Sequence, residues 1–315
     1  VDRGLSFIRK MKTVLTPPSD PAQVPGPVEE QLLKVITEAE TALDTDAILA
    51  RSMKSAGNVL IPSFFALGEP AGNADSALPA FALKSALDES KGYSVAATRS
   101  QQPIELIGAA AAGVGHLNPW PDVDGAVRFE PLLVNYYGKA VPSLALLAAI
   151  KSLNLSVTDV KLHAPDSVQI GKLRVKTDEA AVMMPQFYKG REGKPAFTVD
   201  SFYDVLSGKI PAAKYAGKIV IIGGTAAGVG SHLSAPGYPA LAPAETMAHV
   251  ISSILSEHFI VQPAWVGLAL LAVLLLIVAY LTVGLPRLSA GAAAAVTLLL
   301  FASLLGTEFG MLSGA

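Results

Sequence analysis

A long stretch without any charged side chain, residues 264–285 (AWVGLALLAVLLLIVAYLTVGL), dominates this sequence. It exceeds the ~20 apolar residues that an α-helix needs to cross the hydrocarbon core of a bilayer. Pro263 precedes it, where a first helical turn tolerates a residue without an N–H. Trp265 and Tyr280 lie toward its two ends, as aromatic residues do at membrane interfaces. We therefore predict a transmembrane helix rather than a buried helix of a soluble core.

A second uncharged run, residues 288–306, follows after the turn formed by Leu285, Pro286 and Arg287. Residues 263–306 therefore predict a helical hairpin of two spans in the lipid bilayer. Arg287 is the charge of that turn, so the positive-inside bias places the turn in the cytoplasm. Residues 1–262 would then face the periplasm or the cell exterior, and residues 307–315 would form an outer loop leading to a possible third span.

Composition excludes several classes of protein. The net charge of -2 argues against a nucleic-acid surface, which needs a basic excess. The chain has no cysteine, so disulfides, zinc–thiolate sites and cysteine nucleophiles are excluded. The sequence begins with Val1 and shows no signal peptide, although an outer domain must be exported. We expect that a leading segment has been removed or left out, and that the chain is a piece of a longer protein.

Strands alternate with helices before the first span, which predicts a single α/β domain. The helices are expected from Pro27 onward and at residues 45–55, 78–87, 104–113, 142–153 and 199–206. The strands are expected at residues 59–65, 127–136, 168–175, 181–187 and 218–222, and Gly171-Lys172 is expected to break the third of them.

Helical spacing predicts which side chains of the two early helices face inward. They are Val28, Leu32, Val35 and Ile36 in the first helix, and Ile48, Leu49 and Met53 in the second. Residues 1–12 carry several basic side chains among apolar ones, which suits either an amphipathic helix on a membrane or, more commonly, a solvated helix face.

Two short motifs resemble ligand sites, but the spacing of their residues does not match the spacing that those sites need. Residues 218–224 (KIVIIGG) run into a glycine turn, yet Thr225 stands where a dinucleotide fingerprint needs its second glycine. Asp122 and Asp124 suggest a calcium loop, but Trp120 and Pro131 occupy positions that must be acidic. A turn ordered by aspartate side chains is the favoured interpretation, and Asp122, Asp124 and Arg128 would form a charged cluster there.

No catalytic, metal or cofactor site is predicted. The five histidines have no helical metal-pair spacing, and no G-x-S-x-G elbow is present.

The helix expected at residues 245–259 bears on mechanism. Its apolar positions follow the spacing of one buried face: Met247, Val250, Ile251, Ile254 and Leu255. Glu245 suits the positive end of this helix. Residues 260–263 alone separate the helix from the first span, and so short a linker can transmit a shift that a long flexible one would absorb. Alternatively, the helix packs without signalling and the linker is an anchor.

Two blocks of residues resemble the second type of CHASE domain, a sensory extracellular domain associated with cyclases and histidine kinases. The first block holds Gly115, Asn118, Asp122, Asp124-Gly125, Arg128, Pro131-Leu132 and Pro142-Ser143-Leu144-Ala145. The second holds residues 204–208, residues 217–223 and Glu245 before an apolar span. The resemblance runs from about Asp46 to the membrane hairpin. The chain departs from the family pattern at its front end, at Ser231-His232, and at Met247, with His249 nearby.

The resemblance implies an extracytoplasmic sensory input domain of a bacterial receptor in the inner membrane. It further implies a cytoplasmic adenylate or guanylate cyclase or kinase, a homodimer or membrane complex, and an unknown small-molecule or protein ligand. The residues of interest are Asn118, Asp122, Asp124 and Arg128 as a ligand or structural loop, and Glu245 and His249 on the signalling helix. The alternatives are a structural or assembly subunit that uses the domain for docking, and a membrane-anchored nucleotide-dependent enzyme.

Overall fold

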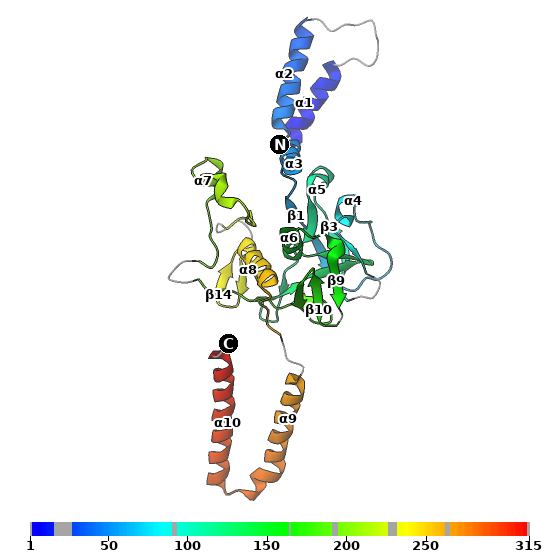
Figure 1. Cartoon of the computed structure of the whole chain (residues 1–315). Helices are drawn as coiled ribbons and strands as arrows, with labels where there is room; N and C mark the ends of the chain where they lie inside the picture. The colour runs from blue at the N-terminus through cyan, green and yellow to red at the C-terminus, as the bar shows by residue number, and fades with distance from the viewer. Residues whose placement is uncertain are drawn as a thin grey trace. The chain divides into compact units, whose positions relative to one another are not determined.

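The computed structural model describes residues 2–15, 27–89, 93–163, 165–190, 195–225, 232–261 and 265–313 (Figure 1). The chain forms two compact units, Val1–Ile260 and Val261–Ala315. Pro263, Ser231 and the proline-rich residues 16–26 lie outside the described residues.

A six-stranded mixed sheet with the order β2-β8-β7-β3-β1-β4 forms the centre of the first unit. Its strands are β1 (Leu60–Leu67), β2 (Leu87–Asp88), β3 (Val95–Gln101), β4 (Gly113–His116), β7 (Leu133–Tyr136) and β8 (Lys139–Pro142). The pairs β1–β4 and β3–β7 are parallel, and the others are antiparallel. The α/β prediction is therefore confirmed.

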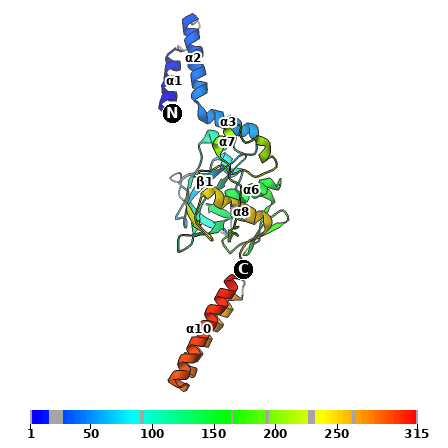
Figure 2. The same cartoon turned by 90° about the vertical axis from the view of Figure 1, so that its left-hand side faces the viewer.

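Helices of the first unit pack on this sheet. Helix α6 (Leu144–Ser152) contacts β1, β4 and α8 (Pro243–Ser256), and the two helices lie side by side in both views (Figures 1 and 2). Their apolar side chains form the larger core, together with Leu132, Leu133 and Ile170. A second core around Phe65, Phe81 and Val114 lies beneath α4 (Ala80–Leu83), while α5 (Glu105–Ala110) packs between α4 and α3 (Thr45–Ala56).

Three smaller sheets and a short helix complete the domain. They are β9 (Val160–His163), β10 (Ser167–Ile170) and β11 (Leu173–Lys176); β5 (Trp120–Pro121), β6 (Val127–Pro131) and β12 (Val182–Met183); β13 (Leu233–Ala235) and β14 (Tyr238–Leu241); and α7 (Phe202–Leu206). Single 3-10 turns cover Val157–Asp159 and Ala212–Tyr215. The break predicted at Gly171-Lys172 is the turn of the β10–β11 hairpin, and the φ of 58° at Gly171 suits a residue without Cβ.

Helices α1 (Asp2–Leu15) and α2 (Pro27–Leu43) pack against each other (Figures 1 and 2). Of the inward face predicted for α2, Ile36 is buried, whereas Val28, Leu32 and Val35 are exposed. In α3 the prediction is also partly wrong. Met53 and Ala50 are buried, but Ile48 and Leu49 are exposed, because a solvent-facing helix can repeat apolar residues without a partner to cover them.

Two predicted strands are corrected in extent. Residues 127–136 form β6 and β7, which belong to different sheets, because β6 pairs with β5 and β12 whereas β7 pairs with β3 and β8. The strand predicted at residues 181–187 contains β12 alone, Val182–Met183.

The buried strand predicted at residues 218–222 is wrong. These residues form no strand in the described structure, and Ile219, Val220 and Ile222 are exposed. Ile221 alone packs against the larger core. Strand propensity measures how well side chains fit a pleated, half-buried surface, and it does not show whether an edge is free to pair with the segment.

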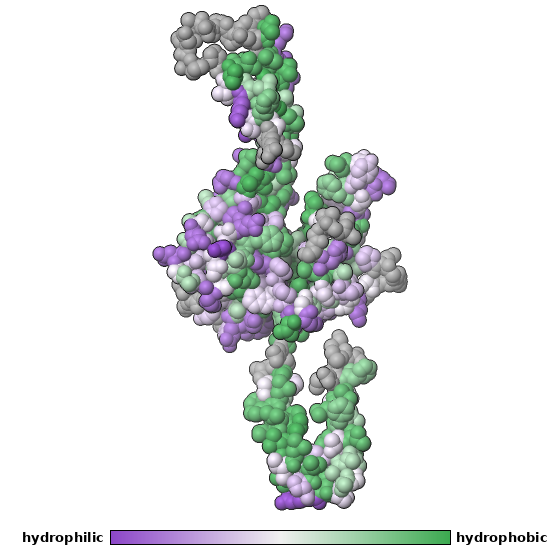
Figure 3. All heavy atoms as spheres, turned by 180° about the vertical axis from the view of Figure 1, so that it is seen from behind, coloured by the Kyte–Doolittle hydropathy of each residue, from purple (hydrophilic) through white to green (hydrophobic). Residues whose placement is uncertain are grey.

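The second unit is helical. It consists of α9 (Val266–Ala279), a π-helical turn (Tyr280–Gly284), a 3-10 turn (Leu285–Arg287) and α10 (Ala290–Ser313). Val266–Arg287 and Ala290–Thr307 are each long and apolar enough to cross a membrane. Hydrophobic side chains cover both helices almost continuously (Figure 3). Residues 307–313, predicted as part of an outer loop, are helical, since α10 continues through Gly306 and Gly310 and meets no proline before its end at Ser313.

Candidate functional site

The loop between β5 and β6 brings together three of the predicted site residues. The Arg128 guanidinium donates to the carboxylates of Asp122 at 2.9 Å and Asp124 at 2.6 Å, the latter through both Nη atoms. Hydrogen bonds from Arg128 hold the pKa of Asp124 well below its usual range, and the same pair raises the pKa of Arg128. Because the contact is bidentate, the Arg128–Asp124 pair is stronger and more directional than an ordinary surface ion pair.

The two carboxylates also bond to the loop backbone. Asp122 Oδ1 accepts from the Val123 N–H at 2.7 Å, and Asp124 Oδ1 accepts from the Ala126 N–H at 3.0 Å. Gly125 has a φ of 82°, which closes the turn. The charged side chains of this loop therefore stabilise its conformation. A ligand role for these residues stays a prediction.

Asn118 connects the end of β4 to β1. Its Nδ2 donates to the Phe65 carbonyl at 2.6 Å, and its Oδ1 accepts from the Phe65 N–H at 3.1 Å. The side chain thus continues the β1–β4 pairing past the last strand residue, His116. The structure gives Asn118 a bonding role beside the sheet, and it does not bring Asn118 into the Asp122–Arg128 cluster.

A row of polar side chains runs from the middle of β1 to the carboxyl end of β4. Ser63 pairs in register with His116, and His116 forms an isolated parallel bridge with Ser143. All three are buried. Ser143 Oγ accepts from the Leu146 N–H at 3.1 Å and so caps α6. Carboxyl ends of parallel strands are where α/β sheets commonly bind ligands.

Two members of this row have polar atoms without a hydrogen-bond partner in the described part of the chain. They are Nε2 of His116 and both amide atoms of Gln102. Gln102 follows Gln101, which pairs with Phe64, so it stands at the level of Ser63. Burial lowers the pKa of His116 to about 3, although the Pro131 carbonyl opposes this effect. His116 is therefore a neutral imidazole at physiological pH.

Glu130 of β6 adjoins the same row. Burial raises the pKa of its carboxyl to about 8, and the Ser143 side chain partly offsets the rise. We name Ser63, Gln102, His116, Glu130 and Ser143 the polar row. The sequence did not identify it, because its members lie on separate elements and carry no shared spacing.

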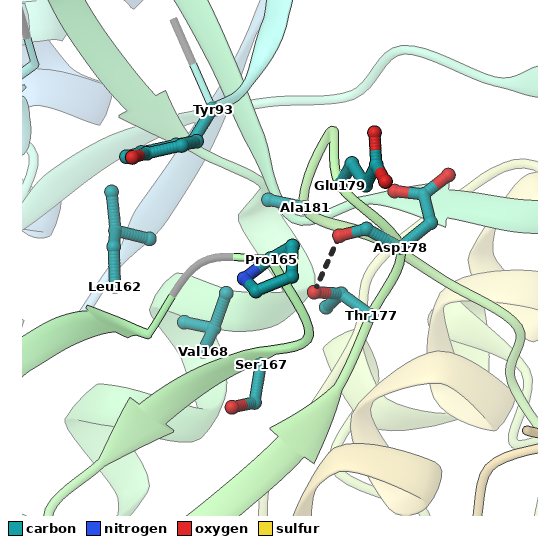
Figure 4. Close-up of a pocket in the computed structure, with 9 residues that line it drawn as sticks. All are labelled: Tyr93, Leu162, Pro165, Ser167, Val168, Thr177, Asp178, Glu179 and Ala181. Atoms are coloured by element: carbon teal, nitrogen blue, oxygen red, sulfur yellow. Dashed lines mark hydrogen bonds between the residues drawn. The ribbon is translucent and has the colours of Figure 1, made fainter. Parts of the chain in front are cut away.

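A small cavity lies elsewhere in the domain, beneath β9, β10 and the turn at residues 177–179 (Figure 4). Its volume is about 10 Å³, which suits a single water molecule rather than an organic ligand. At the edge of the cavity, the Thr177 hydroxyl donates a hydrogen bond to the Asp178 carbonyl at 3.0 Å. The described residues contain no cluster of three or more His, Asp or Glu side chains suited to a metal ion.

Helix α8 carries the two remaining predicted residues. Glu245 Oε2 accepts from the Ala242 N–H at 3.2 Å, which satisfies a donor just before the helix start. On the inner face Val250, Ile251 and Ile254 are buried. Met247 and Leu255, the other two positions of the predicted face, are partly buried against the same core, so the predicted face is confirmed.

His249 lies on α8 within a set of four aromatic rings. The ring centroids of Phe187, Tyr188, Phe197 and Tyr238 stand 5.2, 5.9, 4.8 and 5.3 Å from that of His249. Nδ1 of His249 accepts from the Tyr188 N–H at 3.1 Å, which assigns the proton of the neutral ring to Nε2. Burial lowers the pKa of His249, and the charge of Glu245 opposes the shift. The aromatic ring set thus joins α8 to Phe187, Tyr188 and Phe197 and to Tyr238 of β14.

The carboxyl end of α8 is tied to the chain segment after β12. Ser253 Oγ accepts from the Gln186 N–H and donates to its carbonyl, both at 3.0 Å. The Ile260 N–H donates to the Met184 carbonyl at 2.9 Å, next to a bridge between Phe259 and Pro185. The backbone is therefore held in place as far as Ile260.

Comparison with known protein families identifies the chain. The family model described as the CHASE2 domain matches residues 18–286, which is well over half of the sequence. Comparisons with the curated proteins and with the solved structures gave no match. CHASE2 domains are extracytoplasmic sensory domains, and the two apolar helices agree with a membrane protein. The chain belongs to the CHASE2 domain family.

Proposed function

We propose that this chain is the sensory input region of a bacterial receptor in the inner membrane. Residues before 263 lie outside the cytoplasm in this proposal, and α9 and α10 cross the bilayer. A ligand, small molecule or protein, alters the domain, and α8 passes the change to a cytoplasmic output domain, either a nucleotide cyclase or a kinase. The domain itself performs no chemistry.

The observation that carries the proposal is that the backbone is bonded to the core as far as Ile260, close in sequence to the first apolar helix. One face of α8 is buried, its end is bonded to residues 184–186, and the backbone is held through Ile260. The first apolar helix begins at Val266. A displacement of α8 therefore reaches the span through a few residues, with little slack in which to be lost.

An insertion series in the complete gene product tests this path. One, two, three or four alanines are added after Val261, and the activity of the output domain is measured in membranes. Helix α8 ends at Ser256 and α9 begins at Val266, so each added residue lengthens the connection between them, and output should fall step by step with the number inserted. A flexible Gly-Ser insert of matched length is the control, and it should uncouple output from the sensor.

Two results would count against the proposal. Output that is indifferent to every insert would favour a structural or assembly subunit, since docking does not require a rigid connection. A complete gene product without any output domain would lead to the same conclusion.

A further inference from the structure

His249 holds α8 to the chain segment after β12 through a hydrogen bond that only the neutral imidazole accepts. Nδ1 of His249 accepts from the Tyr188 N–H at 3.1 Å. An unprotonated ring nitrogen is an acceptor, whereas both ring nitrogens of an imidazolium are donors. Protonation of His249 therefore replaces the bond by two donors that face each other. We call the bond between the Tyr188 N–H and Nδ1 of His249 the His249 contact.

The ring set around His249 gives an imidazolium no replacement partner. Two of its four rings are phenylalanines, which carry no polar side-chain atom. The Tyr188 hydroxyl is bonded to Nδ1 of His258 at 3.2 Å, and the Tyr238 hydroxyl donates to the Tyr188 carbonyl. The described part of this ring set thus supplies no carboxylate and no unbonded hydroxyl. His249 is 1% exposed, so its charged form would lose both hydration and a hydrogen bond.

The charged groups near the ring do not compensate for this loss. Burial lowers the pKa of His249 below its ordinary value of 6.5, and the charge of Glu245, one helical turn earlier on α8, opposes the shift only in part. On the neighbouring segments, the side chains of Lys189 and His258 are exposed. The closed His249 contact therefore contains the neutral ring, and opening of the contact lets the ring take up a proton.

The other bonds between α8 and this segment do not depend on protonation. Ser253 Oγ bonds to the N–H and the carbonyl of Gln186, both at 3.0 Å, and the Ile260 N–H donates to the Met184 carbonyl at 2.9 Å. None of these groups titrates. Loss of the His249 contact therefore separates α8 from Tyr188 while the carboxyl end of the helix stays attached, so the change is local.

We propose that the domain responds to acidification of its surroundings, and that protonation of His249 is the event that releases α8 from Tyr188. The proton is thus the ligand of this site. The inference rests on the proposed sensor function for its consequence, a change of output, whereas the release itself does not depend on that function. The His249 contact is fully stable above pH 6.5 and weakens as pH falls below this value, because the open form binds the proton and the closed form does not.

Hydrogen exchange of the full chain in nanodiscs tests the release directly. The protection of the Tyr188 amide is measured by mass spectrometry with electron-transfer fragmentation, relative to the intrinsic exchange rate at each pH. From pH 7.5 to pH 5.5, this protection should fall about tenfold, because one pH unit below 6.5 favours the protonated, open form by about that factor. Amides of α6 should keep their protection, which distinguishes release of α8 from loosening of the whole domain.

Three variants assign the proton to His249. In His249→Asn the side-chain carbonyl oxygen lies about where Nδ1 of histidine lies, so it accepts from the Tyr188 N–H without titrating. Protection should then change less than twofold between the two pH values. His249→Phe keeps an aromatic ring without an acceptor, so protection should be low at both pH values. His258→Asn is the matched control, since it removes the exposed histidine bonded to the Tyr188 hydroxyl, and it should retain the tenfold fall.

The results of hydrogen exchange are decisive for the release. Protection that does not change with pH in the wild type, or an equal fall in His249→Asn, would overturn the proposal. Loss of the fall in His258→Asn would also overturn it, because His258 would then be the group that binds the proton. Circular dichroism verifies that each variant retains its secondary structure.

Output of the complete gene product separates this inference from the sensor proposal. In proteoliposomes, a shift of the outer pH from 7.5 to 5.5 should change the output of the wild type and leave that of His249→Asn unchanged. If output responds to the insertion series but not to outer pH, the acid response is refuted and the sensor proposal stands. Output that ignores both removes the sensor proposal and, with it, the acid response, even where hydrogen exchange shows that α8 is released.

Discussion

Gly115 determines how closely α6 approaches the central sheet. A Cβ placed at this residue would stand 2.8 Å from backbone atoms of Leu144 and 3.1 Å from the Pro142 carbonyl. Backbone at a helix start cannot move aside as the end of a side chain can. A glycine at position 115 is therefore required for β4 and α6 to pack this closely.

Replacement of Gly115 by alanine should destabilise the domain by about 1–3 kcal/mol, the usual cost of overpacking. The control is Gly113→Ala, where a Cβ would meet the ends of the Leu147 and Ser85 side chains at 3.0 and 3.1 Å. Those side-chain ends can shift, so the control should cost less. Urea unfolding of the full chain in detergent measures both. Equal losses would contradict the argument.

Glu130 gives a pH-dependent prediction. Its pKa is raised in the folded state to about 8 from 4.5, so the folded chain holds a proton that the unfolded chain releases. The stabilisation is present below pH 4.5 and is lost as pH rises through 8. Between pH 5 and 8, Glu130→Gln should therefore lose less unfolding free energy than the wild type. Unfolding free energies that change in parallel with pH for the two proteins would refute this. The control variant is Glu105→Gln, which replaces an exposed carboxylate.

At the scale of elements, the sequence predicts best where one helix or strand contains the whole pattern. The buried face of α8 follows from the spacing of Val250, Ile251 and Ile254, and it is confirmed. The segment at residues 218–222 failed because its apolar side chains indicate a strand but not a partner edge. The polar row was invisible for a related reason: Ser63 and His116 become neighbours only when β1 pairs with β4.

The contact between His249 and Tyr188 provides a test of how α8 is held. His249→Phe keeps the ring volume but removes the acceptor of the Tyr188 N–H, which leaves a buried donor unpaired. The expected loss of unfolding free energy is about 1–3 kcal/mol. His258→Phe is the control, because His258 bonds to the exposed side of Tyr188 through its hydroxyl. If His258→Phe proved the more damaging, the ring set around His249 would not anchor the helix.

At the scale of the whole molecule, the family follows from residues in two blocks, and the spans follow from hydropathy. The side of the membrane rests on Arg287 and on the family. The exposure of Val28, Leu32 and Val35 could not be foreseen, because an apolar helix face looks the same in the sequence whether or not another element covers it.

Labelling of intact cells tests the orientation of the complete gene product. An impermeant maleimide should react with Lys151→Cys, at an exposed position of α6, and should spare Arg287→Cys until the cells are opened. The reverse pattern would place the domain in the cytoplasm and remove the receptor proposal.

The turn between α9 and α10 has a mechanical consequence. The Tyr280 hydroxyl reaches the Thr297 hydroxyl at 2.8 Å and the Ala293 carbonyl at 3.2 Å. In a medium without water, nothing competes for such a hydrogen bond, so it holds the two helices together. A tilt imposed at the beginning of α9 would then also tilt α10, and the two helices would move together.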